Sequence, residues 1–165
     1  MLRVSVKRAL VVSVVSGLVA LVVPMAGAVT VGNGEACTPG YWKNHTSSWE
    51  EYNPNTLVKN QFTALNDPAY SAFSSTTFLQ ALQGGGGDNL TGATKILLRA
   101  AVAAFLNAAH DSLSYPLRRD ATGFNGEPPI RSSVNDALDS MDRDTILALA
   151  TTLDNANNNG VCPLS

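Results

Sequence analysis

The sequence has few charges and few cysteines, and it lacks the common catalytic motifs. Charged residues make up 15% of its 165 residues, and only two residues are cysteines. It contains no Gly-x-Ser-x-Gly, His-Glu-x-x-His or dinucleotide-binding glycine pattern, so the enzyme classes that depend on these motifs are not indicated. The run Gly84–Gly87 is not followed by Lys-Ser or Lys-Thr, which excludes a phosphate-binding P-loop there.

Two further absences concern strands and metals. Apolar and polar residues do not alternate with period two outside the N-terminal apolar run, which argues against a β-sheet. An acidic cluster near the C-terminus lacks the loop glycine and the terminal glutamate of an EF-hand, so capping and solvation explain it better than calcium. We therefore expect no cofactor and no metal ligands. The cluster consists of Asp136, Asp139, Asp142 and Asp144.

Residues 1–28 have the pattern of a cleaved secretory signal peptide. A positively charged start is followed by 14 apolar residues, Leu10 to Val23, and by the small-residue end Ala26-Gly27-Ala28. The alternative is a membrane anchor, but the apolar run is shorter than the ~20 residues that a span usually needs. We expect cleavage after Ala28, a secreted or extracellular location and no membrane association thereafter.

Cleavage changes the size and charge of the protein. It leaves 137 residues, and it removes Arg3, Lys7 and Arg8, so that 8 basic residues face 13 acidic ones at a net charge of −5. This charge, without basic clusters in the sequence, argues against nucleic acid as a partner. A chain of this length buries roughly two-thirds of its unfolded surface, which is enough for one core. We expect residues 29–165 to form a single domain.

The two cysteines, Cys37 and Cys162, stand near the two ends of this domain. Exported proteins fold in oxidising compartments, so a disulfide is the expected state of such a pair. Two isolated cysteines do not make a zinc site, and no Cys-x-x-Cys redox motif is present. We expect a Cys37–Cys162 bridge that joins the termini.

Apolar residues at helical spacing predict an all-α fold. The strongest predicted element is an Ala/Leu-rich helix over Thr91–Ala109. It is apolar nearly all round, so we expect it to be the buried central helix; the alternative is a second membrane span. We expect an irregular orthogonal array of five to seven helices around it. The other predicted helices are a short one from Ser47 or Ser48 through Glu51, pieces over 56–65, 68–73 and 76–83, and helices over 132–140 and 143–157. Asp67, Ser75 and Asp142 are the expected N-caps of the helices that follow them, and Ser133 and Asp136 have the spacing of a capping box. Thr38-Pro39-Gly40 predicts a turn, and Gly84–Gly87 predicts a helix stop and a flexible link.

The most distinctive stretch is 41–52, which concentrates aromatic residues. Aromatic side chains with amide neighbours stack on sugars or anchor protein partners when exposed, and complete a small core when buried. We favour the core role for this cluster. The candidate binding residues are Tyr41, Trp42, Lys43, His45 and Trp49.

His45 and His110 are the only histidines in the chain. Together with a carboxylate such as Glu50 or Asp111 they would make a metal or acid–base site. Alternatively, His110 interacts with a helix C-terminus and His45 hydrogen-bonds its local turn. We favour this second interpretation, because nothing in the sequence links the two histidines.

The segment Cys37-Thr38-Pro39-Gly40-Tyr41-Trp42-Lys43-Asn44-His45 resembles the signature of a group of uncharacterised secreted or cell-surface proteins, mainly bacterial. The resemblance implies an extracellular setting, with no established activity or catalytic residue. This chain departs from the group over 118–129, which is longer and more irregular. The resemblance continues through 97–104, 107–110, 115–117, 142–144, 153–154 and 158–164.

These observations predict a secreted structural or interaction module, with a cell-surface protein or glycan as partner. One alternative is a small extracellular enzyme or metal-binding protein that uses His45. Another is carbohydrate or cell-wall binding through 41–52. Burial of Trp42 against the central helix would favour the module, whereas an open pocket shared by Trp42, His45 and His110 would favour the enzyme.

Overall fold

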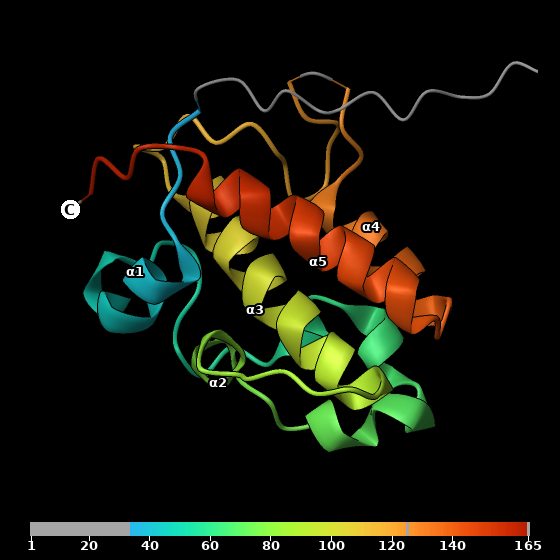
Figure 1. The fold of residues 1–165 in the computed structure, drawn as a ribbon. Helices are drawn as coiled ribbons and strands as arrows, with labels where there is room; N and C mark the ends of the chain where they lie inside the picture. The colour runs from blue at the N-terminus through green and yellow to red at the C-terminus, as the bar shows by residue number, and fades with distance from the viewer. Residues whose placement is uncertain (1–33, 125, 165) are drawn as a thin grey trace, which may run out of the picture.

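The computed structural model describes residues 34–124 and 126–164, which fold into an all-α domain (Figure 1). The predicted signal peptide lies outside the described residues. The all-α prediction is confirmed: the described residues form helices joined by loops, with two isolated β-bridges and no strand. The α-helices are α1 (Pro39–Asn44), α2 (Phe78–Leu82), α3 (Leu90–Ala109), α4 (Ile130–Asp139) and α5 (Arg143–Asn158), and the 3₁₀ helices are η1 (Thr46–Ser48), η2 (Val58–Asn60), η3 (Thr63–Asn66) and η4 (Pro68–Phe73).

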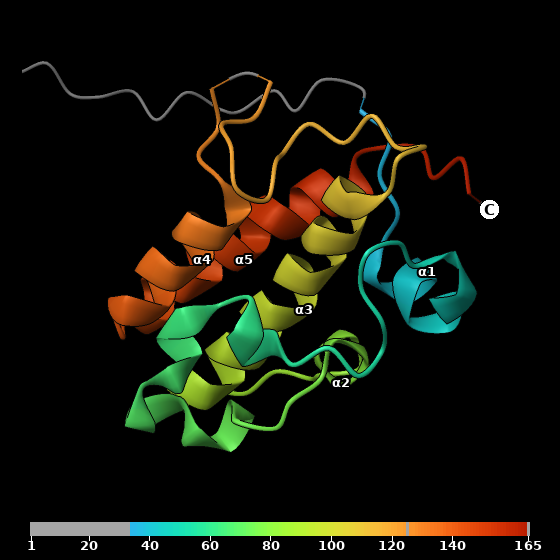
Figure 2. The same ribbon diagram turned by 180° about the vertical axis from the view of Figure 1, so that it is seen from behind.

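Helix α3 is the centre of the fold, as the sequence predicts. The side chain of Asn89 caps its first turn by accepting a hydrogen bond from the Gly92 N–H at 2.8 Å. α3 is long and apolar enough to cross a membrane, but 78% of that apolar stretch is buried inside the domain. Helices α1, α2, α4 and α5 all pack against α3. Because α3 and α5 lie side by side, the array of helices is only approximately orthogonal (Figures 1 and 2).

The two ends of the domain are joined, and the predicted Cys37–Cys162 disulfide is present. Beside it, Glu35 and Val161 form a parallel bridge, and the Ala36 N–H donates to the Val161 carbonyl at 3.2 Å. The Cys37–Cys162 disulfide closes a loop of 125 residues that contains all the helices of the described domain. Figure 1 shows the C-terminal segment beside the start of the described chain.

The expectations for the segment after Cys37 were wrong in detail. Thr38 to Gly40 do not form an isolated turn but begin α1: the Thr38 hydroxyl accepts from the Tyr41 N–H at 3.1 Å, and proline occupies the first helical position. The helix expected through Glu51 is absent. Trp49 has an extended backbone and its indole N–H donates back to the Trp42 carbonyl at 3.0 Å, while Glu51 has a positive φ of 59°, so neither residue continues a helix.

The region 56–83 also differs from the prediction. The helix expected over 56–65 is broken into η2 and η3, because the backbone pairs with residues 76–78: the Val58 N–H donates to the Thr76 carbonyl and the Phe78 N–H to the Thr56 carbonyl. The expected Ser75 cap is not formed. Thr77 caps α2 instead, in a capping box completed by the Gln80 side chain. The predicted Asp67 cap is present, on a 3₁₀ helix.

The connection between α3 and α4, which the structure describes over 110–124 and 126–129, is held to the domain, and its Leu113, Tyr115 and Leu117 are buried. The Ile130 N–H donates to the Arg118 carbonyl at 2.9 Å, and the Arg131 N–H donates to the Arg119 carbonyl at 3.0 Å. Arg119 pairs with Glu51, and Arg131 pairs with Asp120. The capping box expected at Ser133 and Asp136 is not formed: α4 begins earlier, at Ile130, without a side-chain cap.

Candidate functional site

Trp42, at the centre of the predicted binding segment, is completely buried. Its indole N–H donates to the Asn107 side-chain oxygen of α3 at 3.1 Å. The same oxygen accepts from the Cys37 N–H at 2.8 Å, and the Asn107 amide donates to the Cys37 carbonyl at 2.9 Å. Trp42 and Cys37 are therefore held against the central helix by one polar side chain.

The buried polar network continues from Asn107 to α5. The Asn107 amide donates to the Asn157 side-chain oxygen at 3.0 Å, which also accepts from the Tyr115 hydroxyl at 2.8 Å. The Asn157 amide donates to the Ala100 carbonyl at 2.9 Å. Burial raises the pKa of Tyr115 far above its usual value of 10.0, so this phenol stays protonated. Each polar group of the network has a partner, which identifies the network as structural.

The other aromatic candidates also support the fold. Tyr41 donates its hydroxyl to the Leu164 carbonyl at 2.9 Å, and its ring stacks on His45 with 4.2 Å between centroids. Trp49 is half-buried beside Phe78. These contacts hold the C-terminal segment and the region after α1 to the domain, so most of the aromatic surface of this segment is used internally.

The structure keeps the two histidines apart, but it brings His110 to Glu50, one of the carboxylates that the sequence suggests as its partner. The exposed His45 has its Nδ1 2.9 Å from the Tyr41 carbonyl. The His110 Nδ1 accepts from the Ser112 N–H at 3.2 Å, and its Nε2 lies 3.6 Å from a Glu50 oxygen. Glu50 in turn accepts from the Asp111 N–H at 2.7 Å. No described contact links the two rings, and the described residues contain no group of three His, Cys, Asp or Glu side chains placed to hold a metal.

Of the predicted binding residues, Lys43 lines a hollow in the surface of the described domain. This hollow, of about 450 Å³, is lined by α1, by the C-terminal end of α2, by Arg99 of α3, and by Asp154 and Asn158 of α5. A second hollow of about 450 Å³ lies between η4, α2 and α3 around Lys95. Both are lined by Gly84. We call the two hollows together the basic groove.

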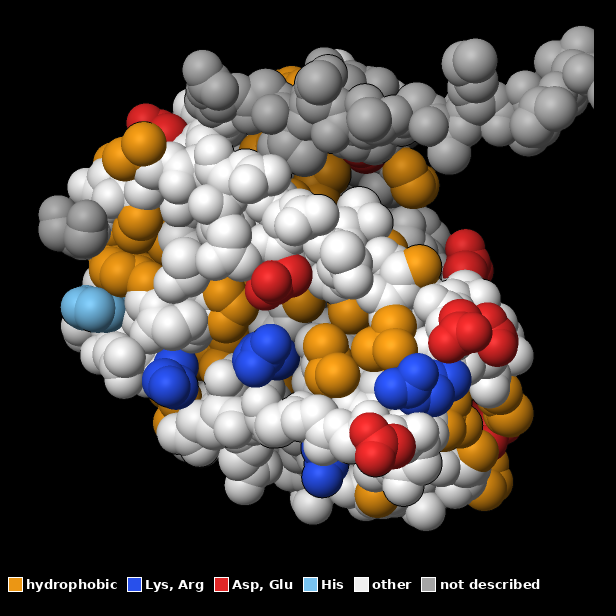
Figure 3. Space-filling view, viewed as in Figure 1, with side chains coloured by type: hydrophobic (Ala, Val, Ile, Leu, Met, Phe, Trp, Pro, Cys, Tyr) orange, Lys and Arg blue, Asp and Glu red, His pale blue; other side chains and the backbone are white. Residues whose placement is uncertain are grey.

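Unpaired cations gather in the basic groove. Four of the eight described basic residues, the arginines at 118, 119, 131 and 143, engage carboxylates or backbone carbonyls. Four others make no hydrogen bond or ion pair with another described residue, and three of these line the groove: Lys43, Arg99 and Lys95. The fourth is Lys59. Figure 3 shows Lys and Arg side chains along this recessed face, with an acidic side chain at its upper edge.

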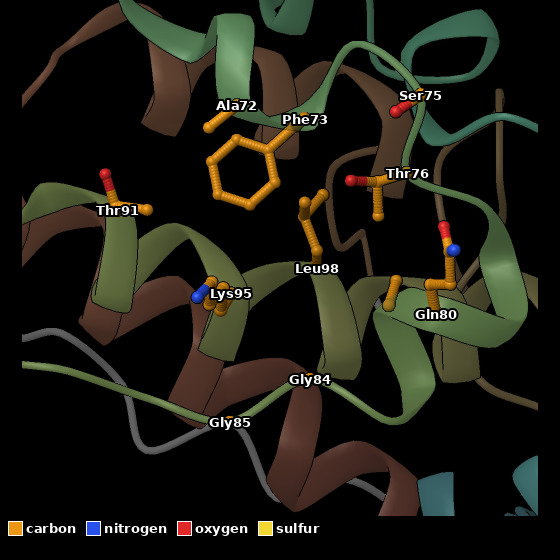
Figure 4. Close-up of a pocket in the computed structure, with 11 residues that line it drawn as sticks. Ala72, Phe73, Ser75, Thr76, Gln80, Gly84, Gly85, Thr91, Lys95 and Leu98 are labelled. Carbon is orange, nitrogen blue, oxygen red and sulfur yellow. The ribbon is translucent and has the colours of Figure 1, made fainter.

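The glycine run begins where the two hollows share a lining residue: Gly84 lines both, and Gly85 lines the first. Gly84 and Gly85 cross the face of α3 beside Lys95, with Phe73 on the opposite wall (Figure 4). The run lies so close to α3 that a Cβ added at Gly92 would stand 2.4 Å from the Gly87 backbone. A glycine run after a helical stretch predicts a helix stop and a flexible link, and it gives no local indication of the groove. The available signal was Lys95 and Arg99, one turn apart on one helix.

No protein-family model, curated protein or solved structure matches this chain. The resemblance based on residues 37–45 therefore stays a prediction.

Proposed function

We propose that this protein is a secreted interaction module that binds anionic ligands in its basic groove. The observation that carries the proposal is the placement of Lys43, Lys95 and Arg99, three cations without a partner among the described residues, along one recessed face. The predicted mature chain as a whole is acidic, with a net charge of −5 that includes these three cations. A cationic recess on such a surface attracts anions locally while the remaining surface repels them.

The proposed secretion rests on two independent features. Residues 1–28 have the charged start, apolar centre and small-residue end of a signal peptide. The Cys37–Cys162 disulfide fits an oxidising compartment, since such bonds are rare in the cytosol. An exported protein whose N-terminal sequence begins at Val29 is the expected result, and one that begins at Met1 would contradict it.

The interaction module receives more support than an enzyme that uses His45. Trp42 is buried against α3, and each histidine uses Nδ1 in a short-range contact with its own segment. The carbohydrate hypothesis based on the aromatic segment has little exposed ring surface to use, because Trp42 is buried and Tyr41 and Trp49 are partly so. Of that segment, Lys43 is the residue that lines the groove.

Titration of the isotope-labelled protein with short charged chains tests the proposal. We expect hexaglutamate or hexagalacturonate to shift the backbone amide signals of Gly84, Gly85 and Lys95, and hexalysine to leave them unchanged. The double variant Lys43→Glu/Arg99→Glu should lose the response. Lys59→Glu is the single-charge control, because Lys59 also has no partner in the described part of the chain but does not line either hollow. Absence of binding by both anionic chains would refute the proposal.

A further inference from the structure

We propose that the ligand of the basic groove is a carboxylated polysaccharide segment, in which uronic acid rings occupy both hollows. This inference rests on the proposed function and specifies its ligand. It follows from the neutral groups that surround the three cations, from the position of Asp154, and from the way in which the two hollows meet at Gly84.

Hydroxyl and amide side chains surround Lys95 in the first hollow. Ser75, Thr76 and Thr91 line it together with Gln80, and none of the three hydroxyls makes a hydrogen bond with another described residue. Figure 4 shows Thr76 and Thr91 on either side of the apolar wall formed by Phe73 and Leu98. A sugar ring offers the matching chemistry, because it carries several hydroxyls around an apolar face. Lys95 supplies the charge for its carboxylate.

The second hollow combines cations with hydrogen-bond acceptors. Lys43 and Arg99 line it together with the half-buried Asp154. Asn158 also lines it, and because its amide N–H donates to the Asp154 carbonyl, its oxygen stays available as an acceptor. A uronic acid ring offers a partner to both kinds of group. Its carboxylate would pair with Lys43 and Arg99, and its hydroxyls would donate to Asp154 and Asn158. A chain of carboxylates alone would place negative charge against Asp154.

The two hollows suit a chain better than a single small molecule. Each has a volume of about 450 Å³, within the range of sites for small ligands, and Gly84 lines both. Lys95 and Arg99 stand one helical turn apart, about 6 Å, which is comparable to the length of one sugar ring. A chain with one carboxylate on each ring therefore presents charge to successive cations as it crosses the Gly84 backbone.

Calorimetry with four matched hexamers tests the sugar assignment. The ligands are hexagalacturonate, its fully methyl-esterified form, hexaglutamate and a sulfated hexasaccharide. We expect the uronate to bind most tightly, and the methyl ester at least roughly tenfold more weakly, because it keeps the hydroxyls but loses the charge. Lys95→Glu should weaken uronate binding by roughly tenfold or more, whereas Lys59→Glu should change it less than about twofold. Circular dichroism confirms that both variants are folded.

A hydroxyl variant separates sugar recognition from simple charge attraction. Thr91→Val keeps the shape of the side chain and removes its hydroxyl, so it should weaken uronate binding while leaving hexaglutamate binding unchanged. If hexaglutamate or the sulfated chain binds as tightly as the uronate, the sugar assignment is wrong while the proposed anion-binding function stands. If no anionic chain binds, or if Lys95→Glu leaves uronate binding unchanged, both proposals fail.

Discussion

Replacing Asn107 with alanine should destabilise the protein more than the loss of one exposed hydrogen bond would. Asn107 is completely buried and serves four partners: the Cys37 N–H, the Cys37 carbonyl, the Trp42 indole and Asn157. Asn157 keeps the hydrogen bond from Tyr115 when Asn107 is removed. The other three groups lose the hydrogen-bond partner that the structure gives them.

The magnitude follows from these three groups. Leaving one buried donor or acceptor without a partner costs about 1 to 3 kcal/mol. Water that enters the space of the missing side chain relieves part of this cost, so we expect about 3 to 5 kcal/mol in total. The free energy of unfolding of a small domain is about 5 to 15 kcal/mol, so the variant should lose a large share of it.

Urea unfolding with the disulfide intact measures this loss through the midpoint and slope of the transition. Asn44→Ala is the control: its amide donates to the Gly40 carbonyl at 3.0 Å on an exposed surface, so its effect should stay within about 0.5 kcal/mol. A double-mutant cycle with Trp42→Phe should show a coupling of at least about 0.5 kcal/mol. A loss below about 1 kcal/mol for Asn107→Ala, or additive effects in the cycle, would refute the structural role assigned to the network.

Three further predictions concern stability. Removing the disulfide by Cys37→Ala/Cys162→Ala should cost up to about 5 kcal/mol, because the 125-residue loop then gains freedom in the unfolded chain; an unchanged urea midpoint would contradict this. Thr77→Ala should cost about 1 kcal/mol through the lost cap of α2, whereas Ser75→Ala, the cap expected from the sequence, should cost less than about 0.5 kcal/mol by the same assay. Hydrogen bonds from Thr145 hold the pKa of Asp142 below its usual value of 3.8, so this cap stabilises the fold above that pH and is lost as the pH falls through the lowered pKa. Asp142→Asn should therefore lose less stability than the native protein between about pH 5 and about pH 2, and equal losses would show that Asp142 does not contribute.

The long helices could be predicted because their information is local. α3 and α5 have many good helix formers at helical spacing, and Asp142 marks the start of α5 with a side chain that does cap it. The short elements could not be predicted in the same way. Residues 57 and 77 form a bridge across the connection between them, and this long-range pairing outweighs the helical spacing of 56–65.

The candidate site depends even more on tertiary structure. Lys43 and Arg99 line one hollow because α1 packs against α3, and no local pattern brings two residues so far apart together. Thr38-Pro39-Gly40 is compatible with a turn and with a capped helix start, and in the folded protein it is the start of a helix that carries the buried Trp42. The role of Asn107 has no local sequence signal, because the groups that it bonds belong to other segments of the chain.

The disulfide between the two ends gives this domain an unusual response to mechanical tension. When a force pulls on the two ends of the chain, it passes directly through the Cys37–Cys162 bond. The helices between the cysteines then carry no load and keep the groove intact. Once the bond is reduced, the same force reaches every helix, and the 125 residues of the loop extend to roughly 400 Å. The redox state of one bond thus decides whether the domain behaves as a short rigid link or as a long extensible one.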